Sequence, residues 1–495
     1  MPKTVGVAVS NATFHFDKLY TYAVMPDQQD TVRLGSMVLV PFGRGSRARM
    51  GVVLACDAEP ESAKLKFLFD VAPASACLTP ELLRLVHFLK ERTFCTYYEA
   101  VKAVIPYGAQ YKPTVAEDGV TPVLQKQLVR HTENAYKLVG TLPPKPRPTA
   151  KQLAAVALLA GGERTLSALE EKGISRAVLD NLCAKGVLEC SKVNKSIDLY
   201  SSIPLKNEPI LLTEEQQAAY DALLPGLEDA APHSALLYGV TGSGKTLVFL
   251  KLIEHCLQMG RRALVLVPEI SLTPQMILRL KSQFGKRVAV QHSALNHTER
   301  LLQWQMIQDG GADIVVGTRS AIFSPLENIG LVIIDEEQEH TYRSEKSPRY
   351  DAGEVARLRA RHHHGLCVLA SATPSIESAY RAQKGEYLLA RLTERYGGVP
   401  LPEVTILDLR ERPMAAEALS EELCEQLMQN LGCGEQSILF VNRRGYSATA
   451  TCMSCHRPLE CPHCSISLKF HAANGRLMCH YCGYSTEVPL SLIHI

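Results

Sequence analysis

One glycine-rich segment, at residues 239–246, constrains the fold of this 495-residue chain more than any other feature. It reads G-V-T-G-S-G-K-T, follows an apolar run at 235–238 and precedes a helix-like stretch at 247–258. A strand, a glycine-rich turn and a helix in this order form a phosphate-binding loop, because backbone N–H groups at the helix N-terminus surround phosphate oxygens. The pattern predicts a P-loop α/β domain. Its expected phosphate-binding residues are Gly239, Val240, Thr241, Gly242, Ser243, Gly244, Lys245 and Thr246.

The chemistry of such a loop assigns roles to particular side chains. Lys245 is expected to reach the β- and γ-phosphates, and Thr246 to offer its hydroxyl to Mg²⁺. Downstream, the apolar run 331–334 ends in Asp335 and Glu336. Asp335 is expected to hold Mg²⁺, directly or through water, and Glu336 to orient or deprotonate the attacking water. Lys245, Asp335 and Glu336 are therefore the predicted catalytic residues of an ATP-hydrolysing site.

Apolar runs rich in Val, Ile and Leu alternate with helix-like stretches from residue 211 onward. Such runs predict strands buried on both faces of a parallel sheet. Short polar clusters follow three of the runs, at 266–272, 316–320 and 369–374, and resemble helicase motifs Ia, Ib and III. Open α/β sheets place their ligand contacts at these strand ends. A further strand is predicted at 437–441.

Residues outside the P-loop are also predicted to contact ligands. Gln216 lies upstream of the loop, where helicases often read adenine. Thr318 and Arg319 belong to the motif Ib cluster and are expected to contact DNA. Arg443, just after the predicted strand 437–441, either contacts DNA phosphates or is a simple surface charge. Trp304, the only tryptophan, either stacks on a base or belongs to the core.

Six of the fifteen cysteines form three C-x-x-C pairs within one short stretch. Such turns supply thiolates to zinc, and a reduced compartment favours metal binding over disulfides. Six thiolates do not divide into two four-ligand sites. Either a histidine (His456, His463 or His480) completes one site, or a fourth pair is missing. The predicted ligands are Cys452, Cys455, Cys461, Cys464, Cys479 and Cys482.

The N-terminal part of the chain carries weaker signals. Residues 1–105 combine short β-like runs with a helix-like stretch from Pro80, which suggests a small barrel or sandwich. A cluster of arginines there either tracks a phosphate backbone or is a solvated edge. Residues 149–199 read as short helices followed by a β-like tail, which is typical of a winged helix but also of domains that bind no DNA.

Composition indicates a cytoplasmic protein. Hydrophobic residues make up 46% and charged residues 21%, which is typical of globular domains and excludes global disorder. The net charge of +2 says nothing about partners, so a nucleic-acid surface must be a local patch. No apolar run approaches the ~20 residues of a membrane span, and the N-terminus lacks the apolar core of a signal peptide.

Several motifs in this order resemble the PriA family of replication-restart DNA helicases. They are G-V-T-G-S-G-K-T, L-V-P-E-I-S-L-T, V-G-T-R-S-A, D-E-E-Q-E-H-T-Y, S-A-T-P-S, F-V-N-R-R-G-Y and the cysteine array. The resemblance implies a superfamily 2, ATP- and Mg²⁺-dependent 3′→5′ DNA helicase that recognises stalled or recombined replication forks and initiates primosome assembly. It also implies branched and single-stranded DNA, primosome proteins, a replicative helicase loader and single-stranded-DNA-binding protein as partners. We expect a monomer, associated with the bacterial nucleoid during replication.

The resemblance also implies an architecture, which is multidomain α/β. A β-rich 3′-DNA-binding domain would cover 1–110, a winged helix 111–204, and the ATP-binding helicase lobe 1 205–405. The start of lobe 2 would cover 406–489, with a zinc-binding insertion at 452–489. In the family the inner cysteines, here Cys461, Cys464, Cys479 and Cys482, bind one Zn²⁺. The outer Cys452 and Cys455 would need a further pair for the second ion of the full-length protein.

Three positions depart from the family pattern. Gln338 stands where the acidic box often has His, so coupling between ATP and DNA could differ. Tyr20-Thr21-Tyr22 replaces an F-D-Y pocket for a 3′-terminal nucleotide, so the carboxylate is absent. Residues 490–495, L-S-L-I-H-I, are what a transposase sequencing adapter would encode, so we expect a non-native tail on a C-terminally truncated sequence. Without the arginine of lobe 2, such a fragment is expected to bind nucleotide and DNA but not to unwind.

Two other functions are compatible with these motifs. One is a DNA-structure-binding scaffold without motor activity, which the intact Lys245, Asp335 and Glu336 argue against. The other is a DNA translocase like those of restriction systems, which the cysteine array argues against. Stimulation of ATP hydrolysis by forked DNA would separate the helicase from the translocase.

Overall fold

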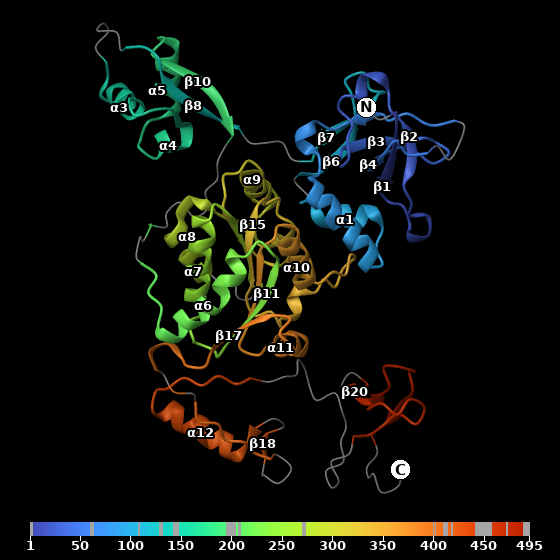
Figure 1. Cartoon of the computed structure of the whole chain (residues 1–495), viewed down its shortest axis with the longest axis vertical. Coiled ribbons are helices and arrows are strands. Elements are labelled where there is room, and N and C mark those ends of the chain that lie inside the picture. Colours follow the sequence, from blue (N-terminus) through green and yellow to red (C-terminus); the bar gives the residue numbers. More distant parts are fainter. Residues whose placement is uncertain are drawn as a thin grey trace. The chain divides into compact units, whose positions relative to one another are not determined.

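The computed structural model contains two compact units, residues 1–399 and 400–495 (Figure 1). Within the described residues, no helix is long and apolar enough to cross a membrane. The structure describes the whole chain except residues 1–2, 60–63, 107–108, 128–131, 142–147, 195–203, 206–208, 270–273, 399, 401, 409–413, 417–418, 441–457, 472–473 and 489–495.

The N-terminal domain is built on a five-stranded antiparallel sheet with the order β2-β1-β4-β3-β5. Alternating apolar residues give the sheet two buried faces: Val5, Val7 and Val38 pack on one, and Leu39 and Val52 on the other. A hairpin of β6 and β7 packs on this domain, where Leu124 N–H donates to Asp70 Oδ2 at 2.7 Å. The elements are β1 (Thr4–Val9), β2 (Tyr20–Ala23), β3 (Met37–Phe42), β4 (Arg47–Cys56), β5 (Asp70–Val71), α1 (Pro80–Arg92), α2 (Tyr97–Val104), β6 (Tyr111–Val115) and β7 (Pro122–Lys126).

Residues 132–194 form a small domain of three short helices on a three-stranded antiparallel sheet, with the order β10-β8-β9. Its core gathers Tyr136, Leu159, Leu169, Leu179 and Leu182. Short helices and a β-like tail therefore lie where the sequence predicted them. The elements are β8 (Thr132–Leu138), α3 (Ala150–Leu159), β9 (Arg164–Thr165), α4 (Leu166–Glu170), α5 (Arg176–Ala184) and β10 (Leu188–Asn194).

The largest domain is a seven-stranded parallel sheet with the order β13-β14-β12-β15-β16-β11-β17. Helices α6, α7 and α8 cover one face, and α9, α10 and α11 cover the other (Figure 1). The predicted parallel sheet, buried on both faces, is confirmed. The strands are β11 (His233–Gly239), β12 (Arg262–Leu266), β13 (Val288–Gln291), β14 (Ile314–Gly317), β15 (Ile329–Ile334), β16 (Leu366–Ser371) and β17 (Leu388–Leu392). The helices are α6 (Glu214–Glu228), α7 (Lys245–Gln258), α8 (Pro274–Phe284), α9 (His297–Gln308), α10 (Ala352–His362) and α11 (Ile376–Gln383).

A buried ion pair joins the N-terminal domain to this parallel-sheet domain. Arg359 on α10 is fully buried, and its guanidinium donates to both carboxylate oxygens of Glu81 on α1 at 2.6 and 2.9 Å. It also donates to three backbone carbonyls of the segment 322–326 at 2.8 to 3.0 Å. Burial opposes ionisation of Glu81, but hydrogen bonds and charge from His363 and Arg359 outweigh it and lower its pKa to about 2. The two domains therefore share one core.

In the described part of the second unit there are a helix and two small sheets. The predicted strand 437–441 is wrong where it can be compared, because residues 437–440 have no regular secondary structure. A strand requires a neighbour for its backbone groups, and no described residue of this unit pairs with that segment. The elements are β18 (Met414–Ala416), β19 (Leu419–Ser420), α12 (Glu421–Gly432), β20 (Lys469–His471), β21 (Arg476–Met478) and β22 (Ser485–Glu487).

Candidate nucleotide site and zinc site

The P-loop turns sharply between β11 and α7. Gly242 and Gly244 have φ angles of +81° and +80°, a region that residues with a Cβ rarely adopt. A Cβ on Gly244 would also lie 2.4 Å from Gln216 Nε2. Lys245 is the first residue of α7, is 8% exposed, and donates from Nζ to Gly239 O at 2.9 Å. The loop thus closes around its own lysine, at the N-terminus of a fourteen-residue helix.

Gln216 contacts the P-loop directly. Its Nε2 donates to Ser243 O at 2.9 Å, and its Oε1 accepts from the N–H of Thr213 at 3.1 Å. The side chain is 1% exposed, so both of its polar atoms are used inside the protein. In this arrangement Gln216 holds the shape of the loop. Its predicted contact with adenine stays a prediction.

The two carboxylates predicted to be catalytic lie opposite the P-loop, at the end of β15. Glu336 Oε1 lies 3.6 Å from Lys245 Nζ, and Glu336 has a φ of +47°, in the left-handed region. Burial and the neighbouring Glu336 raise the pKa of Asp335 to about 6, although Lys245 partly offsets them. A cavity of about 510 Å³ is lined by the loop from Val240 to Leu247, Arg279, Asp335, Glu336 and Tyr396. The structure therefore brings Lys245, Asp335 and Glu336 together around one cavity large enough for a small ligand.

Gln338 connects this site to motif III, a link that the sequence reasoning missed. Its Nε2 donates to Glu336 Oε2 at 2.9 Å, and its Oε1 accepts from the hydroxyl of Ser371 at 2.5 Å. Next to it, Glu337 accepts from Ser375 N–H at 2.6 Å. The sequence showed that both polar clusters follow apolar strands, but the structure shows that these strands, β15 and β16, are neighbours in the sheet. Only the strand order shows that the two clusters meet.

The residues predicted to contact DNA have internal partners. Thr318 is 2% exposed. Arg319 donates to the carbonyls of Thr341 and Arg343 at 3.1 and 2.6 Å, and its guanidinium lies 5.9 Å from the ring centre of Tyr350. Arg319 therefore ties the segment after the acidic pair to motif Ib. Arg443 lies outside the described residues.

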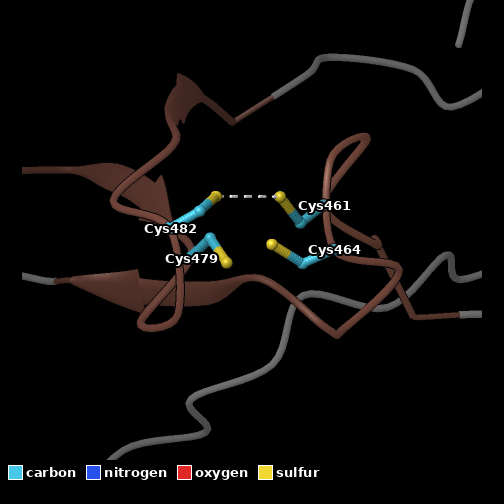
Figure 2. A group of neighbouring side chains, drawn as sticks. All are labelled: Cys461, Cys464, Cys479 and Cys482. Carbon is cyan, nitrogen blue, oxygen red and sulfur yellow. Dashed lines mark hydrogen bonds between the residues drawn. The ribbon is translucent and has the colours of Figure 1, made fainter.

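Four cysteines of the second unit converge on one point (Figure 2). Their Sγ atoms all lie within 4.8 Å of one another, and those of Cys461 and Cys482 are 3.6 Å apart. A tetrahedron of Zn–S bonds of about 2.3 Å requires sulfur atoms ~3.8 Å apart, so the four thiols fit a structural zinc ion. Two residues of this cluster, Cys461 and Cys479, are buried. The converging residues are Cys461, Cys464, Cys479 and Cys482.

Of the other candidate ligands, the two that the structure describes, His463 and His480, do not belong to this cluster. Cys452, Cys455 and His456 lie outside the described residues. His463 packs edge-on against Tyr484, and His480 lies with its Nε2 2.7 Å from that of His471.

Comparison with known proteins places these features in one family. Residues 213–382 match the DEAD/DEAH box helicase family, 5–106 the 3′DNA-binding domain (3′BD), and 461–486 the PriA DNA helicase Cys-rich region (CRR) domain. Replication restart protein PriA of Bacillus subtilis (strain 168) is 37% identical, over 98% of this chain and 67% of that protein. The chain belongs to the PriA family of replication restart proteins. The PriA protein of Haemophilus influenzae is 32% identical, over 95% of this chain and 63% of that protein.

The chain spans about two thirds of the length of these PriA relatives. Among solved structures, RecG bound to a three-way DNA junction is 25% identical with a TM-score of 0.30, and covers 41% of this chain and 28% of that one. The UvsW helicase of bacteriophage T4 is 18% identical with a TM-score of 0.28, and covers 40% of this chain and 66% of that one. The predicted family and the multidomain α/β fold class are confirmed by the PriA relatives and the family models.

Within the 3′DNA-binding domain, the residues that differ from the expected PriA pocket have structural partners. Thr21 donates its hydroxyl to Glu59 O at 3.2 Å. The nearby Asp17 has its side chain 3% exposed, accepts from Tyr97 N–H, and lies 2.6 Å from Lys90 Nζ. Asp17 therefore anchors the start of α2. Trp304 is buried in the core shared with this domain. Of the two roles considered for Trp304, the structure therefore favours a core residue over base stacking.

Proposed function

We propose that this chain is the nucleotide- and DNA-binding part of an ATP-dependent 3′→5′ DNA helicase that recognises stalled or recombined replication forks and initiates primosome assembly. The observation that carries the proposal is the meeting of Lys245, Asp335 and Glu336 around the P-loop cavity, in a chain of the PriA family. Of the expected domain boundaries 1–110, 111–204, 205–405 and 406–489, we propose to move the first to Lys126, because the hairpin of β6 and β7 packs on the N-terminal domain.

The site residues would act on ATP as follows. Lys245 exchanges Gly239 O and Glu336 for phosphate oxygens, and the N–H groups of Gly242 to Thr246 surround the β-phosphate. Mg²⁺, when bound, supplies charge neutralisation of the phosphates, and Asp335 and Thr246 are the residues that would hold it. With a pKa of about 6, Asp335 is mostly ionised at neutral pH and offers the carboxylate that such a cation prefers.

Glu336 is the proposed general base. Gln338 Nε2 donates to Glu336 Oε2 at 2.9 Å, which holds that oxygen in place. The other oxygen, Glu336 Oε1, lies 3.6 Å from Lys245 Nζ. When the lysine turns to phosphate, that second oxygen is free to accept a proton from the attacking water. Because Ser371 binds the same Gln338, a movement of motif III would shift the base. This is a route by which DNA contact would control hydrolysis.

The remaining ligands are proposed on family membership. Cys461, Cys464, Cys479 and Cys482 would hold one structural Zn²⁺, and Cys452 with Cys455 half of a second site. Thr318, Arg319 and Arg443 would contact DNA. Forked and single-stranded DNA, primosome proteins, a helicase loader and single-stranded-DNA-binding protein are the proposed partners of a cytoplasmic monomer.

The test is nucleotide and DNA binding by the chain itself. We expect ATP·Mg²⁺ to bind, and forked DNA to bind without being unwound. Lys245→Ala should weaken nucleotide binding about tenfold or more and spare DNA binding. If Lys245→Ala bound nucleotide as tightly as the native chain, the proposal would be contradicted. Efficient unwinding of forked DNA by the chain would contradict the expectation that it binds forks without unwinding them.

A further inference from the structure

A strap of four residues, 393–396, follows β17 and lies beside the P-loop. Glu215 at the start of α6 fixes its first half. One carboxylate oxygen accepts from the N–H and the hydroxyl of Thr393 at 2.5 and 2.7 Å, and the other accepts from Glu394 N–H at 3.2 Å. Three bonds from one carboxylate give the strap a defined position relative to α6.

The second half of the strap contacts the P-loop itself. Tyr396 N–H donates to Gly242 O at 2.8 Å. The side chain of Arg395 lies beside Gly242, and its Nε is buried with no hydrogen-bond partner in the described part of the chain. The backbone of the strap is therefore attached to the loop that would bind phosphates.

This attachment places Tyr396 at the edge of the nucleotide cavity. Tyr396 lines the same cavity as the P-loop, Asp335 and Glu336, yet it is 58% exposed. An aromatic face that is held in position by its backbone and still open to solvent can bind a base by stacking. Gln216, the residue expected to read the base, has both of its polar atoms engaged by Ser243 and Thr213.

We propose that Tyr396 stacks on the purine base of the bound nucleotide, and that Glu215 is the positioning residue that holds the strap for it. The proposal rests on the proposed binding of ATP, and adds the part of the site that contacts the base. The phosphates lie against the residues around Lys245, and the base lies against the strap.

Binding of two ligands by the whole chain separates the base from the phosphates. ATP and inorganic tripolyphosphate are each titrated calorimetrically in the presence of Mg²⁺. Tyr396→Ala should weaken ATP binding about 5- to 150-fold, the range for loss of one base–aromatic stack, and leave tripolyphosphate binding unchanged. Tyr396→Phe keeps the stacking face and should bind both ligands like the native chain.

Two further variants complete the set. Glu215→Gln loses the carboxylate that holds the strap, and should weaken ATP binding by a smaller factor than Tyr396→Ala, again without affecting tripolyphosphate. Tyr380→Ala removes a tyrosine of similar exposure, 56%, that does not line this cavity, and should change neither ligand.

The outcomes distinguish this inference from the proposed function. If Tyr396→Ala binds ATP as the native chain does, the stacking role is overturned and ATP binding stands. Equal loss of ATP and tripolyphosphate would show that the strap supports the phosphate loop, and loss in Tyr396→Phe would indicate a contact by the hydroxyl; each overturns stacking. If the native chain binds neither ligand, the proposed function itself fails.

Discussion

The nucleotide site and the four-cysteine cluster differ in where their ligand-binding groups come from. The nucleotide site collects side chains between residues 215 and 396, and a seven-stranded sheet with two large cores places them. The cluster takes its thiols from Cys461 to Cys482, and among the residues that the structure describes its buried core consists of Cys461, Leu468, Leu477 and Cys479. Packing can hold the first site in shape before any ligand binds, whereas the second, with so small a core, would depend on the proposed zinc ion.

Removal of zinc should have the largest effect and should be confined to the cluster. Structural zinc contributes apparent binding energies of about 10–16 kcal/mol to small modules. We expect chelation, or Cys479→Ser, to abolish protection from hydrogen exchange between residues 461 and 487, with the thermal transition of the parallel-sheet domain unchanged. The measurement is zinc content together with hydrogen exchange.

A matched control is Cys433→Ser, because Cys433 is exposed and outside the cluster. It should retain zinc and protection. If the cluster residues kept their protection from hydrogen exchange in a zinc-free sample, the cluster would not depend on zinc, and the proposed difference between the two sites would be wrong.

Breaking the ion pair between domains should have the next largest effect. Glu81→Gln leaves Arg359 buried without its charged partner, which typically costs about 3–5 kcal/mol of the free energy of unfolding. Urea denaturation measures the loss. The exposed pair Arg176–Asp180 supplies the control, and Asp180→Asn should change stability by less than about 1 kcal/mol. A similar small loss in Glu81→Gln would show that the two domains do not depend on each other.

The same carboxylate predicts a pH dependence. The pKa of Glu81 is about 2 in the folded chain and about 4.3 in an unfolded one, so its ionised form stabilises the fold above pH 4.3. That contribution is lost as the pH falls from 4.3 toward 2. The stability difference between the native chain and Glu81→Gln should therefore shrink below pH 4. A difference that does not depend on pH would contradict the depressed pKa.

Loss of the hydrogen bonds that link Glu336 to motif III should have the smallest effect on stability. Gln338→Ala removes hydrogen bonds to Glu336 and Ser371, and should cost about 1–2 kcal/mol in the parallel-sheet domain while the zinc content stays the same. Gln217→Ala removes an exposed bond to Asp221 and should have almost no effect on unfolding. If Gln338→Ala and Gln217→Ala have the same free energy of unfolding, the conclusion that Gln338 holds Glu336 in place is wrong.

Local spacing was sufficient to predict the groups proposed to carry the chemistry. The P-loop sequence, the acidic pair after an apolar strand and the C-x-x-C turns each combine neighbouring residues with one chemical requirement. These patterns therefore point to Lys245, Asp335 and Cys461 from the amino-acid sequence alone. The parallel sheet followed in the same way from continuous apolar runs.

Residues that support the sites could not be predicted in this way. Glu215 binds Thr393, Gln338 binds Ser371, and Arg359 binds Glu81, and each pair joins residues far apart in the sequence. Such pairs depend on strand order and domain packing, which no local pattern contains. The strand predicted at 437–441 failed for the same reason, since an apolar run becomes a strand only beside a partner.

The central claim is that the P-loop cavity is a preformed nucleotide site that depends on Lys245. Isothermal titration of ATP·Mg²⁺ into the native chain and into Lys245→Ala tests it directly. The native chain should bind one ATP, and the variant should bind about tenfold or more weakly, because a charged hydrogen bond to phosphate is lost. Equal affinity of the two proteins, or no binding by the native chain, would contradict the claim.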